Sequence, residues 1–143
     1  MANYYATIRT NYFTVKDEKE FREIVDSCSA EDELHIFEVT LPNGSKAFGF
    51  GCYGSIYGIP PGEDEEDDDN SLDAFYDALQ KVLPEDEAII ITEIGWEKLR
   101  YLIGCCTVIT KNDIQFIDVR NKAVDLGGTS GCYIADRGQS RGF

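Results

Sequence analysis

Several segments of the chain show the alternation of apolar and polar residues, or the content of β-branched and aromatic residues, that is typical of β-strands. Residues 88–94, AIIITEI, differ because they are almost continuously apolar. A short run of this kind predicts a central strand covered on both faces or nearly so, and Gly95 is expected to end it. The other expected strands are 3–15, 34–41, 46–53, 99–110 and 114–119.

A turn signal, Pro42-Asn43-Gly44, separates two of these strands. Asn-Gly is the strongest short signal for a hairpin, because both residues tolerate positive φ. Residues 34–41 and 46–53 are therefore predicted to form a β-hairpin.

Apolar residues at helical spacing mark an amphipathic helix over residues 17–28. Asp17 is its expected N-cap, and Glu20, three residues later, completes a capping-box pattern. Its apolar face is made of Phe21, Ile24, Val25 and Cys28.

A second helix is expected to begin after Asn70 or Ser71 and to end before Pro84, which cannot continue a helix. A short third helix is expected over residues 120–126. The apolar face of the second helix is made of Leu72, Phe75, Tyr76, Leu79, Val82 and Leu83.

The expected element order is β-α-β-β-α-β-β-β, which predicts one α+β domain over residues 1–126. Two helices would cover one face of a mainly antiparallel sheet, and the first six elements follow the ferredoxin-like order. Residues 54–70, rich in glycine, proline and acid, are predicted to be an acidic surface loop. Residues 127–143, with little periodicity, are predicted to be a weakly ordered tail.

Charge is the most unusual property of the composition. The 143 residues include 27 acidic and 13 basic ones, for a formal net charge of −14. Such a charge repels phosphate backbones and anionic lipids, so we expect no direct binding to nucleic acid or membrane. The same charge favours basic partners, including proteins whose normal ligand is nucleic acid. The alternative, that acidity only confers solubility, stays open.

Cysteine and histidine usage argues against a metal site. The chain has five Cys, a single His (His35) and no C-x-x-C pair, whereas zinc sites need paired ligands at short spacing. We expect no metal and no cofactor. The N-terminus lacks the pattern of a secretory signal, and no apolar stretch reaches the roughly 20 residues of a membrane helix. We therefore expect a cytoplasmic protein with reduced thiols.

Three patterns would support other chemistry. Gly49–Gly54 is a literal G-x-G-x-x-G, but the two prolines that follow it argue against the helix that a dinucleotide site requires. His35 with Cys52 could form a nucleophile and base, although the hairpin register does not place them opposite each other. Residues 63–69 lack the glycine and the ligand spacing of a calcium loop. We expect none of these activities, although an enzyme of unrecognised class stays open.

Seven consecutive carboxylates form the most distinctive motif. A fully extended chain spaces residues by about 3.3–3.6 Å, and the phosphates of one DNA strand are about 3.4 Å apart. The run therefore approximates the charge density of a nucleic-acid strand, and arginine binds carboxylate and phosphate alike. It could equally be a solvated loop with no partner. Its members are Glu63, Asp64, Glu65, Glu66, Asp67, Asp68 and Asp69.

Aromatic residues lie close to this acid in the sequence. Tyr53 and Tyr57 precede the run, and aromatic side chains beside charge are common at protein interfaces. We include both tyrosines in the candidate partner-binding set. Trp96 is equally compatible with an interface and with a core.

Three segments resemble small acidic accessory proteins carried by mobile elements of Gram-positive bacteria. They are ATIRTNYFTVKDEKEF, KAFGFGCYGSIYG and AIIITEIGWEKLRYLIG, within a resemblance that covers roughly residues 2–126. Short acidic proteins of such elements include inhibitors of restriction and CRISPR enzymes, several of which mimic DNA. The resemblance implies an anti-defence role and carries over no catalytic residue.

The sequence thus favours a non-enzymatic inhibitor that mimics nucleic acid and blocks a basic nucleic-acid-binding protein, such as a defence nuclease. The alternative is a protein-interaction module or immunity-type protein that binds its partner through an aromatic and acidic loop. A homodimer, formed by pairing of an exposed edge strand, is compatible with either.

Overall fold

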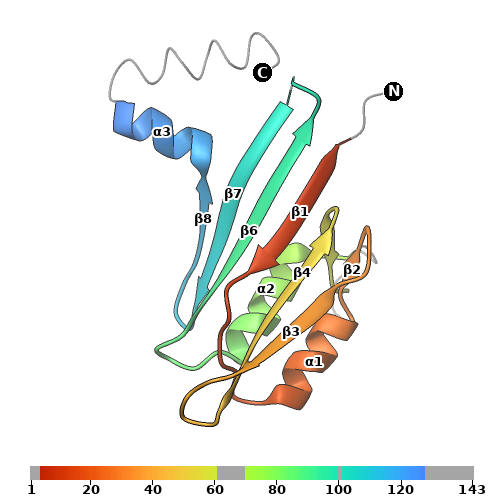
Figure 1. Ribbon diagram of the computed structural model, residues 1–143, viewed down its shortest axis with the longest axis vertical. Coiled ribbons are helices and arrows are strands. Elements are labelled where there is room, and N and C mark those ends of the chain that lie inside the picture. The colour runs from red at the N-terminus through yellow and green to blue at the C-terminus, as the bar shows by residue number, and fades with distance from the viewer. Residues whose placement is uncertain (1–3, 61–69, 100, 128–143) are drawn as a thin grey trace.

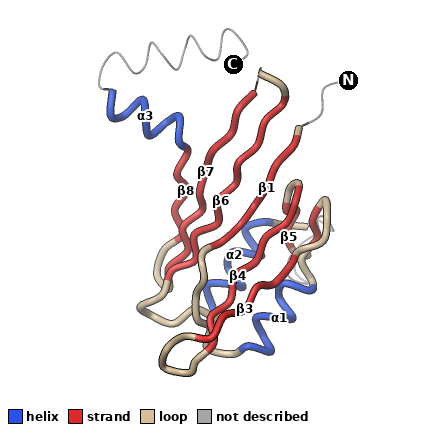
Figure 2. Tube along the Cα trace, viewed as in Figure 1, coloured by secondary structure: helices blue, strands red, loops and turns tan. Residues whose placement is uncertain are grey.

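The computed structural model describes residues 4–60, 70–99 and 101–127 (Figure 1). The strands are β1 (Tyr5–Thr10), β2 (Ser29–Ala30), β3 (His35–Thr40), β4 (Lys46–Tyr53), β5 (Ile56–Gly58), β6 (Ala88–Glu97), β7 (Tyr101–Thr110) and β8 (Ile114–Asp118), and the helices are α1 (Glu18–Asp26), α2 (Leu72–Lys81) and α3 (Val119–Gly127). One six-stranded sheet has the order β3-β4-β1-β6-β7-β8, and β2 pairs with β5 in a small separate ribbon (Figure 2).

The predicted α+β class is confirmed. Every pair of neighbours in the large sheet is antiparallel, and α1 and α2 cover one face of it (Figure 1). Helix α1 lies in the connection between β1 and β3, and β4 lies between these two strands in the sheet. This is the split β-α-β arrangement of ferredoxin-like folds. The observed element order adds β2 and β5, which were not expected. It also includes α3, which the predicted order left out although a short helix was expected over residues 120–126.

Local capping explains where the two covering helices begin. The Asp17 carboxylate accepts hydrogen bonds from the backbone N–H groups of Lys19 and Glu20, as an N-cap does. At α2 the cap is Ser71, whose Oγ accepts from the N–H of Ala74 at 3.2 Å. Both helices therefore begin where short polar side chains replace the missing intrahelical acceptors.

The core fills the space between these helices and the covered face of the sheet. Phe13 and Phe75 both meet Phe50 edge to face, with ring centroids 6.3 and 5.8 Å apart, and all three side chains are fully buried. Burying one such side chain contributes roughly 1.5–3 kcal/mol. Further buried members are Ile8, Phe21, Val25, Phe48, Leu79, Ile89, Ile91 and Ile109.

Two strand predictions were wrong in their bounds. Gly95 does not end the apolar strand, since β6 continues to Glu97 and Gly95 pairs with Ala6 of β1 and Ile103 of β7. The ring of Tyr4 occupies the space where a side chain at Gly95 would lie, so a larger residue there would displace that ring. The first strand ends at Thr10, and Phe13 forms only an isolated bridge to Phe48.

Residues 54–70 were predicted to be a surface loop, and this is wrong for their first part. Ile56 is buried within β5, and Ile59 forms a bridge with Ser71. The remainder, residues 61–69, lies outside the described residues, as does the predicted tail from residue 128 onward.

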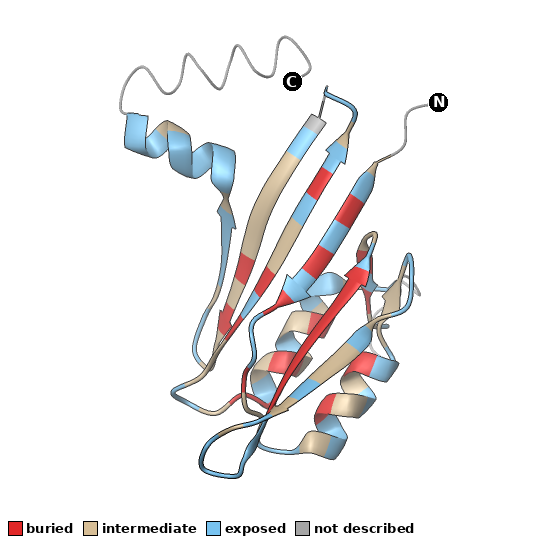
Figure 3. Ribbon diagram, viewed as in Figure 1, coloured by how far each residue is buried: buried red, intermediate tan, exposed pale blue. Residues whose placement is uncertain are grey.

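The second face of the large sheet is covered by neither α1 nor α2, and we call it the open face. Figure 3 shows exposed positions alternating with buried ones along β1 and β6. The prediction that β6 is covered on both faces is therefore wrong, because Ile90 and Ile94 are 39% and 53% exposed. By pairing and alternation, the outward positions are Tyr5, Thr7, Arg9, His35, Phe37, Val39, Ala47, Gly49, Gly51, Tyr53, Ala88, Ile90, Thr92, Ile94, Trp96, Leu102, Gly104, Cys106, Val108, Thr110, Gln115 and Ile117.

Candidate functional site

The outer surface of α1 and α2 carries seven carboxylates, and we call this surface the acidic helix side. It is defined by Asp17, Glu18, Glu20, Glu23 and Asp26 with α1, and by Asp73 and Asp77 of α2. The apolar stripe of each helix faces the core, so these charges necessarily lie on the outer surface. Acid in the first turn of each helix also suits the positive end of the helix dipole.

Two cations on this side are already engaged by carboxylates. Arg22 lies 3.0 Å from both Glu18 and Glu38, and Lys46 lies 3.9 and 3.7 Å from the same two groups. All four side chains are 40–51% exposed, so the pairs add little stability. They connect α1 with the edge strand β3 and its neighbour β4.

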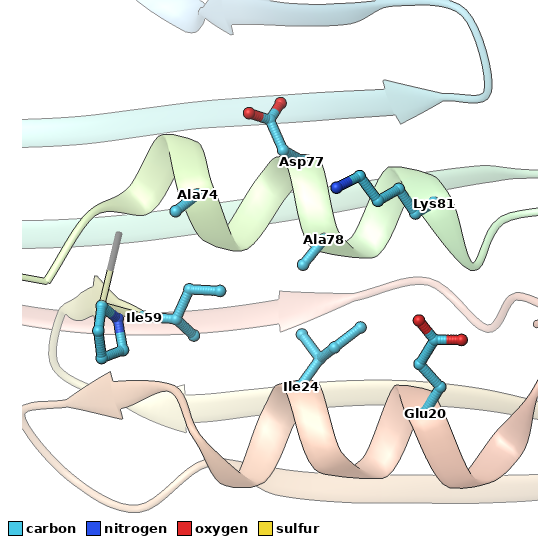
Figure 4. A pocket seen from close by; sticks show the side chains of 8 residues that line it. Glu20, Ile24, Ile59, Ala74, Asp77, Ala78 and Lys81 are labelled. Carbon is cyan, nitrogen blue, oxygen red and sulfur yellow. The ribbon is translucent and has the colours of Figure 1, made fainter. Parts of the chain in front are cut away.

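A groove of about 390 Å³ runs between the two helices (Figure 4). Its apolar lining consists of Ile24, Ile59, Pro60, Ala74 and Ala78. The charged residues Glu20, Asp77 and Lys81 also line it, two acids against one base. The small alanine side chains leave room between the helices, so the groove offers an apolar floor beside carboxylates.

The described residues on either side of segment 61–69 lie next to each other beside this groove. The N–H of Ile59 donates to the carbonyl of Ser71 at 3.2 Å, and the N–H of Ser71 donates to the carbonyl of Ile59 at 2.7 Å. Gly58 packs against the Ser71 backbone with φ of +106°, which a larger residue would resist. The seven predicted site residues Glu63–Asp69 lie outside the described residues.

The two predicted aromatic residues are exposed and lie on different sheets. Tyr53 ends β4 on the open face and is 68% exposed, whereas Tyr57 lies in β5 and is 48% exposed. Between them Glu31 accepts a hydrogen bond from the Ser55 N–H at 3.1 Å and packs against Gly54. The turn that joins the tyrosines is therefore hydrogen-bonded to a carboxylate from another segment of the chain.

Geometry gives no support to the alternative chemistry. His35 pairs with Gly51 and points to the open face, whereas Cys52 is buried among the core residues of the other face. Burial raises the pKa of Cys28, Cys52 and Cys105 to about 11, which keeps these thiols protonated near neutral pH.

The glycines of the G-x-G-x-x-G pattern have a packing role. A Cβ on Gly51 would lie 2.6 Å from the carbonyl oxygen of Ile8, and one on Gly49 would lie 3.0 Å from that of Asn11. Both are inside β4, and the next element in the described chain is the strand β5. The pattern reflects the close approach of neighbouring backbone.

Sequence reasoning missed the open face, although AIIITEI carried a signal for it. A strand that is apolar on both faces is expected to be covered on both faces, but α1 and α2 cover only one face of the sheet. The large exposed residues there are Tyr5, Tyr53, Ile90, Ile94, Trp96, Leu102 and Ile117.

Among the described residues, no three Cys, His, Asp or Glu side chains are grouped so as to hold a metal ion. No helix in the described part of the chain has the length and apolar character needed to cross a membrane. Comparison with protein-family models, with curated proteins and with solved structures finds no match.

Proposed function

We propose that the protein is a non-enzymatic inhibitor that places carboxylates where a basic protein binds the phosphates of nucleic acid, a defence nuclease being the expected class of target. One observation carries the proposal. The acidic helix side carries seven carboxylates, and two of them, Glu20 and Asp77, line the apolar groove between α1 and α2.

The groove adds a means of selecting one basic partner over another. An aliphatic side chain of the partner would fill the space between Ile24 and Ala78, while Glu20 and Asp77 would pair with flanking Lys or Arg side chains. Charge alone is promiscuous, because any cationic surface attracts it. Apolar contact beside the carboxylates supplies shape discrimination, which mimicry of a phosphate backbone lacks.

The cytoplasm is the location that fits this proposal. Cys28, Cys52, Cys105 and Cys106 are all free thiols in the described chain. Free cysteines persist in reducing compartments, where nucleic-acid-handling enzymes also act.

The test is a capture experiment with three variants of the chain. The first replaces Glu63–Asp69 by Asn or Gln, and the second carries Glu20→Gln with Asp77→Asn at the groove. The matched control carries Asp86→Asn with Asp125→Asn, which removes the same charge as the second variant from exposed positions outside the groove.

Each immobilised protein is exposed to host extract at low and high salt, and bound proteins are then eluted with duplex DNA or with RNA. We expect the unmodified chain and the control to release a nucleic-acid-binding protein on addition of the nucleic acid. The other two variants should retain less of it, and binding should fall steeply with salt. Capture that neither nucleic acid nor salt reverses would refute the mimic.

A second function, interaction with a partner of another class, is favoured by the exposed Tyr53 and Tyr57 on either side of Glu31. Exposed tyrosines beside a carboxylate suit a protein interface. In this case replacement of both tyrosines by Ala would abolish capture, whereas neutralising the acidic run would not.

A further inference from the structure

The open face differs in charge from the rest of the molecule. In a chain with 27 acidic residues, none of the outward positions of the described strands holds Asp or Glu. Arg9 and His35 are the basic residues there. The guanidinium of Arg9 lies 4.2 Å from the ring centre of Phe37 and donates to the hydroxyl of Tyr12.

Apolar side chains on this face are contiguous. Tyr5, Trp96 and Leu102 lie directly opposite one another across β1, β6 and β7, and they are 54%, 46% and 58% exposed. The rings of Tyr5 and Trp96 are 5.7 Å apart. Ile94 adjoins this row along β6. Contiguous exposed apolar surface of this kind marks an interaction site.

Helix α3 extends the same surface. Val119, at its start, lies against Gly104 on the open side of β7, where a Cβ would be 3.2 Å away. None of the nine residues of α3 is buried, and Val119 and Leu126 are 61% and 80% exposed (Figure 3). An isolated helix this short is marginal in water. Its stability would benefit from a cover on this side.

We propose that the cover is a second copy of the chain, packed with its own open face against this one. Each outward side chain occupies roughly 30 Å² at the usual strand spacing and rise, so the six strands offer on the order of 600–700 Å². A standard interface buries about 800 Å² on each partner, and α3 supplies further area. The areas therefore match what a stable dimer needs.

The absence of carboxylates from the described outward positions of the open face favours a second copy of the chain over a basic protein as the occupant. A basic protein would find no carboxylate on the open face to pair with, whereas the acidic helix side offers many. Two copies, each with a net charge of −14, repel each other in most orientations. Face-to-face packing of the two sheets, about 10 Å apart, directs both acidic helix sides outward. The inference is independent of the proposed function, because it uses the opposite side of the sheet.

The test is the oligomeric state of the full chain, measured by light scattering after gel filtration and by sedimentation velocity. We expect twice the monomer mass at micromolar concentration for the unmodified chain. Ile94→Glu and Leu102→Glu should each give the monomer, with an unchanged circular dichroism spectrum. The control Leu99→Glu, at an 87% exposed position outside the paired strands, should remain dimeric.

Salt separates this contact from the proposed acidic one. Screening reduces the repulsion between two acidic copies, so the dimer should strengthen as salt rises, whereas capture of a basic partner should weaken. If either glutamate variant misfolds, the milder Ile94→Thr should still weaken the dimer. A monomer at all concentrations up to about 100 µM, on the scale of weak association, would overturn the inference. So would a dimer that survives both glutamate variants, since it would use an edge strand instead.

Discussion

Gly51→Ala measures how closely β1 and β4 must approach. The added Cβ would lie 2.6 Å from the carbonyl oxygen of Ile8, a distance that real Cβ atoms essentially never show. That oxygen belongs to backbone, so no side-chain rotation relieves the clash and the strands must separate. Overpacking of this kind costs about 1–3 kcal/mol. We expect a loss in the upper part of this range, about 2–3 kcal/mol.

The loss corresponds to a decrease in Tm of roughly 6–12 °C for a domain of this size. Urea and thermal denaturation, followed by circular dichroism, would measure it. Gly49→Ala, on the same strand and face but with 3.0 Å to the Asn11 oxygen, should cost less. Gly127→Ala, where a Cβ meets nothing within 4 Å, should change stability by under about 0.5 kcal/mol. If Gly51→Ala were as stable as the Gly127 control, the packing explanation of the G-x-G-x-x-G glycines would be refuted.

Three further outcomes are expected. Phe50→Ala should lower the free energy of unfolding by about 3–5 kcal/mol in urea titrations, because it empties the space between Phe13 and Phe75. Ser71→Ala should cost about 0.5–2 kcal/mol, measured the same way, through loss of the α2 cap, and Ser71→Asp should restore most of it. Burial raises the pKa of Cys28 to about 11 in the folded chain, so the protonated thiol favours the folded state over the unfolded state. This contribution to stability is complete below the ordinary thiol pKa of about 9 and is lost as pH rises through about 11. The denaturant concentration at the unfolding midpoint should therefore fall as pH rises between these two values. A Cys28→Ala variant should show a smaller fall.

Local signals predicted much of the fold. The bounds predicted for the hairpin's return strand, 46–53, are those of β4. Asp17 caps α1 as its spacing indicated, since a cap depends on residues only two or three positions away. Strand alternation and helical spacing are local in the same sense, and they were sufficient to predict the α+β class.

The misses depend on contacts between distant residues. Nothing near Gly95 in the sequence reveals that the ring of Tyr4 fills its side-chain space and lets β6 continue. Strand β5 has three residues, too few to show a period, and it forms because Ala30 and Ser29 lie beside it. The candidate site residues Tyr53 and Tyr57 are exposed, and their role in binding stays a prediction. The groove was not predicted, because it forms between two helices that residues 27–71 separate in sequence.

The difference between the two faces of the sheet also has a kinetic consequence. The described outward positions of the open face hold no carboxylate whereas the acidic helix side holds seven, and this asymmetry adds an electric dipole moment to the net charge of −14. In the field of a cationic partner the molecule would rotate before contact, so that more encounters begin in a productive orientation. Electrostatic steering of this kind raises association rates by 10- to 1,000-fold in favourable cases. In the proposed complex, the arrangement of the helices over one sheet face would therefore affect how fast the two proteins associate as well as how tightly they bind.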